Sequence, residues 1–149
     1  VVTALKAAEK GLIWALLHDP SAGLAALADL DAEDIAGLAS RTILEQARSL
    51  KELPPEALPT TLLERLTRGE AQLVTDLSRP ASPPAPSTAC VQALKRRRFD
   101  RERAEVQREI DRLQEQGGPR FDDEIVTLWT RKKDLLRRIE ALSGDGLPS

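Results

Sequence analysis

The chain has 149 residues, of which 41% are hydrophobic and 31% charged, and its formal net charge is −2. A chain of this length can bury about two thirds of its unfolded surface, so a true hydrophobic core is possible. No apolar run reaches the roughly 18 residues of a membrane helix, and the first residues lack a signal-peptide pattern. We therefore expect a piece of a longer, soluble, cytoplasmic protein.

Few residues are available for catalysis or metal binding. Cys90 is the single cysteine and His18 the single histidine, which excludes an internal disulfide and a Cys/His metal set. Cys90 is typical of a small packed residue near a helix start, and His18 of the last residue of a helix. The acids Asp31, Glu33 and Asp34 fit helix capping better than general acid–base chemistry. We expect no enzyme activity, no cofactor and no metal in this chain.

The residues before the proline-rich segment predict a series of short helices, because apolar residues recur at helical spacing between recognisable end signals. The first helix should stop before Asp19, which can cap a second helix with Pro20 in its first turn. Asp31 is the predicted cap of a third. A longer helix should cover residues 40–52 and end at Pro54.

Two more helices should follow. Thr61 and Glu64 have the spacing of a capping box, in which each side chain binds the other's backbone N–H. Gly69 should interrupt the helix, which residues 70–77 then resume. Nothing alternates with period two over the length of a strand, so the sequence predicts an all-α fold.

Residues 79–88, RPASPPAPST, contain four prolines and no large apolar residue, which is typical of a linker or an extended strap. Charge changes there as well: 8 Lys/Arg and 12 Asp/Glu precede residue 89, and 14 and 12 follow. We therefore divide the chain into a compact helical bundle (1–78), the linker, a helical hairpin (89–142) and a frayed tail (143–149).

The hairpin is predicted from two apolar stripes at alternating spacings of three and four, separated by Gly117-Gly118-Pro119. Such stripes should pair as an antiparallel helical hairpin, with the stems of Arg103 and Lys132 packed between apolar neighbours. Phe121 should staple to Val126 around the start of the second arm. The stripes comprise Phe99, Val106, Ile110 and Leu113 in the first arm, and Ile125, Leu128, Leu135, Ile139 and Leu142 in the second.

Each arm carries a basic cluster. In the first arm, residues 94–109 interleave arginines with acids, a pattern more typical of a solvated coiled-coil flank than of a phosphate-binding surface. In the second, Trp129 and Leu136 lie seven residues apart on a flank beside the stripe that pairs with the first arm. An exposed Trp with Leu and basic neighbours has the composition of a protein interface. The alternative is that Trp129 packs within the monomer.

The segments AEKGLIWALLHDP and EIVTLWTRKKDLLRR, in this order, resemble the C-terminal helicase-binding domain of bacterial DNA primase. The resemblance implies a non-catalytic domain that docks on the N-terminal domains of the hexameric replicative helicase and couples primer synthesis to the replication fork. It also implies that Trp129, Lys133, Arg137 and Arg138 contact the helicase. We add Leu136 because it shares a face with Trp129.

Three other functions stay open at this stage. The helical body of such primases also resembles the N-terminal domain of the replicative helicase itself, so the chain could be that self-assembly domain. A nucleic-acid-binding helical domain and a coiled-coil oligomer are the other two. The resemblance allows one further partner, the acidic tail of the single-stranded-DNA-binding protein, whereas direct nucleic-acid binding should be weak or absent.

Overall fold

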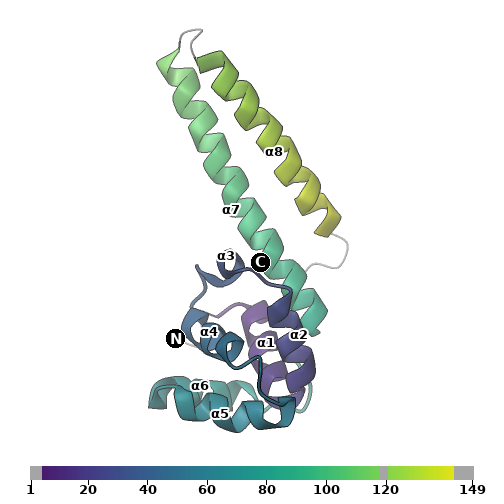
Figure 1. Ribbon diagram of the computed structural model, residues 1–149. Coiled ribbons are helices and arrows are strands. Elements are labelled where there is room, and N and C mark those ends of the chain that lie inside the picture. Colours follow the sequence, from purple (N-terminus) through teal and green to yellow (C-terminus); the bar gives the residue numbers. More distant parts are fainter. Residues whose placement is uncertain (1–4, 118–120, 143–149) are drawn as a thin grey trace.

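The computed structural model describes residues 5–117 and 121–142, and every regular element within them is a helix, as predicted (Figure 1). Seven elements form a bundle and two form a hairpin that extends beyond it. None of the helices in these ranges combines the length and apolar character needed to cross a bilayer. The bundle comprises α1 (Ala7–His18), α2 (Pro20–Ala28), α3 (Ala32–Ile35), α4 (Arg41–Ser49), the 3₁₀ helix η2 (Pro55–Ala57), α5 (Leu58–Arg65) and α6 (Arg68–Leu77), and the hairpin comprises α7 (Ser87–Gln116) and α8 (Asp122–Leu142).

Two of the predicted helix starts are confirmed. The Asp19 carboxylate accepts a hydrogen bond from the Ala22 N–H at 3.4 Å, and Pro20 opens α2. Asp31 and Asp34 form a reciprocal capping box at the start of α3, in which the Asp31 N–H donates to Asp34 Oδ2 at 2.8 Å. Both caps satisfy backbone donors that a helix leaves unpaired at its first turn.

The predicted capping box at Thr61 and Glu64 is wrong. Both residues lie inside α5, which starts earlier, after the 3₁₀ turn that Pro54 and Pro55 initiate. The helix break also precedes Gly69, which lies within α6. The box actually forms between Thr67 and Glu70, where the Thr67 N–H donates to the Glu70 carboxylate at 3.0 Å and the Glu70 N–H donates to Thr67 Oγ1 at 3.2 Å.

The proline-rich linker is tied to the outer side of α1. The indole N–H of Trp14 donates to the carbonyl of Pro80 at 2.8 Å, and the His18 ring stacks on the Trp14 ring with centroids 4.2 Å apart. His18 is the last residue of α1, as predicted, and its Nε2 bonds the carbonyl of Ser78. The linker ends two residues earlier than expected, because α7 begins at Ser87.

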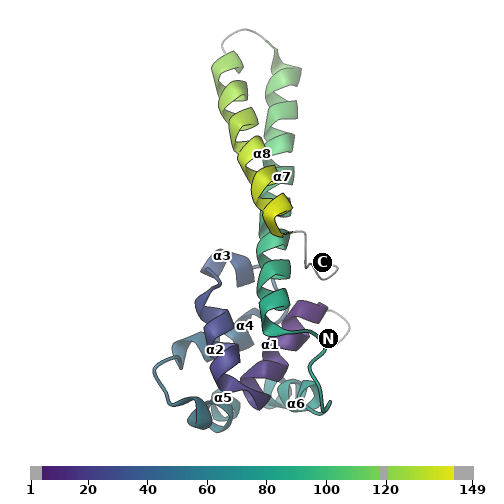
Figure 2. The same ribbon diagram turned by 90° about the vertical axis from the view of Figure 1, so that its right-hand side faces the viewer.

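One long helix, α7, belongs to both hydrophobic cores. Its first turns, including Cys90 and Leu94, pack inside the bundle core with α1 and α2, whereas Phe99, Val106 and Ile110 pack against Leu135 of α8. The two views show α7 rising out of the bundle with α8 antiparallel beside it (Figures 1 and 2). The predicted antiparallel hairpin is therefore confirmed, and α7 connects it to the bundle as one continuous helix.

Glycine ends α7 for a conformational reason. Gly117 has a φ of 68°, a left-handed conformation that side chains with a Cβ disfavour, and its N–H donates to the Leu113 carbonyl at 3.2 Å. The predicted turn at Gly118 and Pro119 and the tail at 143–149 lie outside the described residues.

Candidate partner-docking surface

One side of α8 exposes a row of large apolar side chains. Val126 is 63% exposed, Leu136 43% and Trp129 39%, and they are the exposed large hydrophobic residues of the described chain. Lys133, also exposed, lies in the same row between Trp129 and Leu136. We call these four residues the outer stripe.

Helix geometry explains why the row exists. Successive residues of an α-helix turn by about 100°, so spacings of three and four keep side chains on one face. Leu135, with Ile125, Leu128 and Ile139 around it, faces α7 and closes the hairpin core. The outer stripe has the same spacing on the adjoining flank. Because α8 packs chiefly on α7, no helix within residues 5–117 and 121–142 covers this second row.

Trp129 is held in place and only partly covered, with 39% of its surface exposed. Lys132 Nζ lies 4.5 Å from the centroid of the indole ring, in a cation–π contact, and the same ammonium group donates to the Gln107 side chain of α7. The stem of Lys132 is partly buried between the arms, as the sequence predicts. These contacts position the ring at the edge of the hairpin and leave the rest of it accessible to a partner.

The predicted contact residues do not all share one surface. Trp129, Lys133 and Leu136 lie together on the outer stripe. Arg137 and Arg138 instead bind Asp134, which lies outside the outer stripe, with N–O distances of 3.4 Å and 3.0 Å. The Arg138 guanidinium also approaches the Phe99 ring of α7, 5.7 Å from its centroid. Arg137 therefore borders the outer stripe and Arg138 faces away from it.

Lys133 differs from its basic neighbours because no hydrogen bond or ion pair engages it in the part of the chain that the structure describes. Lys132 is bound to α7 and Arg137 to Asp134. The one ammonium group in the middle of the apolar row is thus the free one, available to a carboxylate from outside.

Val126 is the member of the stripe that sequence reasoning assigned elsewhere. It was expected to pack under Phe121 as a hydrophobic staple, yet it is the most exposed large hydrophobic residue described. The spacing could have revealed it, because Val126 precedes Trp129 by three residues and so continues the row that Trp129 and Leu136 define.

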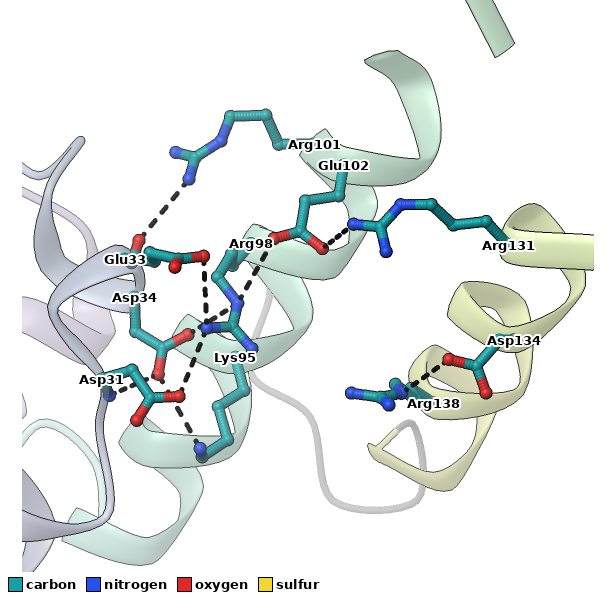
Figure 3. A network of polar contacts seen from close by, with 10 residues as sticks. All are labelled: Asp31, Glu33, Asp34, Lys95, Arg98, Arg101, Glu102, Arg131, Asp134 and Arg138. Carbon is teal, nitrogen blue, oxygen red and sulfur yellow. Dashed lines mark hydrogen bonds and ion pairs between the residues drawn. The ribbon is translucent and has the colours of Figure 1, made fainter. Parts of the chain in front are cut away.

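A network of ion pairs links α3 of the bundle to α7 of the hairpin (Figure 3). Asp34 of α3 has no exposed side-chain surface, and its carboxylate lies 3.2 Å from Arg98 Nε and 3.7 Å from Lys95 Nζ, both on α7. Arg98 also reaches the Asp31 carboxylate at 3.3 Å. The acids that cap α3 therefore also anchor α7.

The same network continues to α8. Arg98 lies 3.8 Å from Glu102, whose other oxygen lies 3.4 Å from Arg131 of α8 (Figure 3). Phe99, next in sequence, contacts the Arg98 guanidinium at 4.6 Å. The first basic cluster is therefore largely occupied inside the molecule, which the sequence pattern of alternating charge did not reveal.

Other reactive groups do not gather into a site within the described residues. No group of three or more His, Cys, Asp or Glu side chains there could hold a metal ion. Burial raises the pKa of the Cys90 thiol to about 11, so the sulfur is protonated and weakly reactive at neutral pH. Cys90 is a packed residue at the start of α7, as predicted.

The outer stripe is defined by the exposure and spacing of its own residues. Compared with family models, with curated proteins and with solved structures, the chain finds no match.

Proposed function

We propose that this chain is a protein-docking domain and that the outer stripe is its contact surface. The observation that carries the proposal is the exposure of Val126, Trp129 and Leu136 in one row around an unengaged lysine. Large side chains of this kind lose much contact with water when a partner covers them, and Trp supplies an outsized share of binding energy at interfaces. Exposed apolar side chains in one row are typical of an interaction site.

The partner follows from the sequence resemblance. We infer that the stripe docks on the N-terminal domains of a replicative helicase, and that the chain is the C-terminal helicase-binding domain of a bacterial DNA primase. In that role it would contribute binding alone, and the primer-synthesising chemistry would belong to other parts of the parent protein. Docking would hold primer synthesis at the replication fork.

Charge favours a protein partner over nucleic acid. Lys95 and Arg98, at the start of the first basic cluster, are paired with Asp34, and Arg98 also with Asp31 and Glu33. Cations already neutralised by carboxylates release few counterions from a phosphate backbone, so they add little affinity for DNA or RNA.

A single substitution tests the proposal. Trp129→Ala should weaken binding of the chain to the cognate helicase N-terminal domains by about 30-fold or more, the loss expected for an interface hot spot. The change is measured by isothermal titration calorimetry. Circular dichroism should be unaltered, because the ring is outside both hydrophobic cores.

Matched variants on the same helix separate the surface from the fold. Thr127 is exposed and lies on the side of α8 away from Trp129, so Thr127→Ala should bind like the parent. The pair Arg137→Glu and Arg138→Glu tests the flank that the resemblance names, and should weaken binding less than Trp129→Ala because both arginines are bound to Asp134. Parental affinity in Trp129→Ala would show the site assignment to be wrong.

A further inference from the structure

The spacing of the residues in the outer stripe indicates which kind of structural element could pack on it. Val126, Trp129, Lys133 and Leu136 are separated by three, four and three residues, the a and d spacing of a coiled coil. The inner row of α8, from Ile125 to Leu135, has the same spacing and is covered by a helix, α7. In a coiled coil, the side chains of a second helix pack into the gaps between the side chains of such a row.

We propose that the outer stripe binds one α-helix of the partner, which packs along α8 as the third helix of the hairpin and places an Asp or Glu against Lys133. The proposal rests on the docking function above and specifies the element that docks. In this complex, α7 and α8 supply two helices of a three-helix coiled coil and the partner supplies the third.

Lys133 dictates the charge of the incoming helix. It lies between Trp129 and Leu136, so a helix that covers both apolar side chains also covers the ammonium group. An unpaired charge inside a closed interface is unfavourable, and a carboxylate at the facing position offsets the desolvation. The neighbouring cations already have partners within the chain, Lys132 in Gln107 and Arg137 in Asp134. A carboxylate of the incoming helix would therefore pair with Lys133.

A second copy of the same chain does not fit the stripe. In a two-fold antiparallel pair, apolar contact is greatest when Trp129 of each copy meets Leu136 of the other. Lys133 lies between these two residues, so this register brings the two ammonium groups together. Like charges at a core position of a coiled coil oppose pairing, which leaves a helix of different sequence as the occupant.

The test uses two synthetic helical peptides of about three heptads, identical except that one central core position is Glu in the first and Lys in the second. Their other core positions are Leu. Each is titrated into the intact chain, with Trp fluorescence and calorimetry as readouts. The Glu peptide should bind about tenfold more tightly than the Lys peptide, the effect of one ion pair gained and one repulsion avoided.

Lys133→Glu should reverse this preference, and Trp129→Ala should weaken both peptides. A further variant, Lys133→Leu, makes the stripe continuously apolar and should dimerise more strongly than the parent chain in sedimentation equilibrium. Equal binding of the two peptides, or a preference that Lys133→Glu leaves unchanged, would overturn the inference.

These outcomes are independent of the helicase experiment. If the charge preference is absent while Trp129→Ala still loses the helicase, the docking surface stands and the acidic helix is wrong. If the charge preference is present but the helicase does not bind the parent chain, the stripe takes acidic helices from some other protein and the proposed function fails.

Discussion

Asp34 and Arg98 form a buried ion pair that joins the bundle to the first arm of the hairpin. The Asp34 side chain is fully buried and the Arg98 side chain is 11% exposed. Asp34 Oδ1 and Arg98 Nε lie 3.2 Å apart, in ionic contact without hydrogen-bond geometry. The two residues are far apart in sequence, one on the shortest α-helix of the bundle and one on α7, the longest helix described. Through this pair the bundle sets where α7, and with it α8, points.

Removing one partner should therefore cost more than a surface ion pair would. Arg98→Ala leaves the Asp34 carboxylate buried with Lys95 as its remaining cation at 3.7 Å. A buried charge deprived of its partner typically destabilises by about 3–5 kcal/mol. We expect a loss near the lower limit, measured as the free energy of unfolding in urea.

Arg101→Ala is the matched control for this ion pair. Arg101 lies on the same helix but reaches only the backbone carbonyl of Glu33, at 3.5 Å. Its removal should change the free energy of unfolding by less than about 1 kcal/mol. Equal losses in both variants would mean that the ion pair does not anchor α7.

Glu9 offers a second buried carboxylate, bound entirely by uncharged donors. Its Oε1 accepts from the Ser40 N–H at 3.0 Å and from Ser40 Oγ at 2.7 Å, and its Oε2 accepts from the Lys6 N–H at 2.7 Å. Glu9→Ala should lower the free energy of unfolding by about 2–4 kcal/mol, because it leaves the backbone N–H groups of Lys6 and Ser40 without their hydrogen-bond acceptor. Thermal unfolding followed by circular dichroism measures the change.

Ser40→Ala deletes only the hydroxyl bond to Glu9 and keeps the backbone donor, so it should cost about 1 kcal/mol. Glu45→Ala, at an exposed ion pair with Arg41, should cost less still. The order Glu9, Ser40, Glu45 is the expected result. A Glu9→Ala variant as stable as Glu45→Ala would remove Glu9 from the bundle's structural residues.

Gly11 lets α1 approach the start of α7. A Cβ at this position would lie 2.5 Å from Cys90 Sγ and 3.0 Å from the Ala85 carbonyl oxygen. Gly11→Ala should therefore destabilise by about 1–3 kcal/mol through overpacking, despite the better helix propensity of Ala. Differential scanning calorimetry would show it as a lower Tm.

Two variants check the cause of that change. Gly69→Ala meets nothing within 4 Å and should leave the Tm unchanged or raise it slightly. Cys90→Ala removes the nearest clashing atom, so adding it to Gly11→Ala should recover part of the loss. Additive effects in the double variant would contradict a direct Gly11–Cys90 contact.

Cys90 should make stability depend on pH in the alkaline range. Burial raises the thiol pKa from 9.0 to about 11, so between these values the unfolded chain releases a proton that the folded chain retains. Stability is unaffected below pH 9 and falls as the pH rises toward 11. Urea unfolding of the parent and of Cys90→Ala between pH 8 and 10.5 measures the difference.

The Cys90→Ala chain should lose the part of the alkaline decline that comes from the thiol. A thiol-reactive dye should also label the folded parent far more slowly than the urea-unfolded chain at pH 8. Rapid labelling of the folded chain would contradict the burial of this sulfur.

The sequence predicted helix caps and helix faces correctly where they depend on residues close together in the chain. The caps at Asp19 and Asp31 depend on hydrogen bonds between groups three residues apart, and the inner stripes of α7 and α8 depend on a period of three and four. Where two local solutions were equally good, sequence was insufficient. Thr61 with Glu64 and Thr67 with Glu70 have the same capping spacing, and burial of Leu58 and Leu62 in the bundle core selects the second.

By itself, then, the sequence determined that the chain is helical, where α2 and α3 begin, and which residues share a face with Trp129. The tertiary structure alone decided which faces are covered. It turned the acids of α3 toward Arg98, held Arg138 on Asp134 and over Phe99, and left Val126 in solvent. The physical reason is that periodicity defines a face of a helix, whereas coverage of that face depends on helices that are distant in the chain.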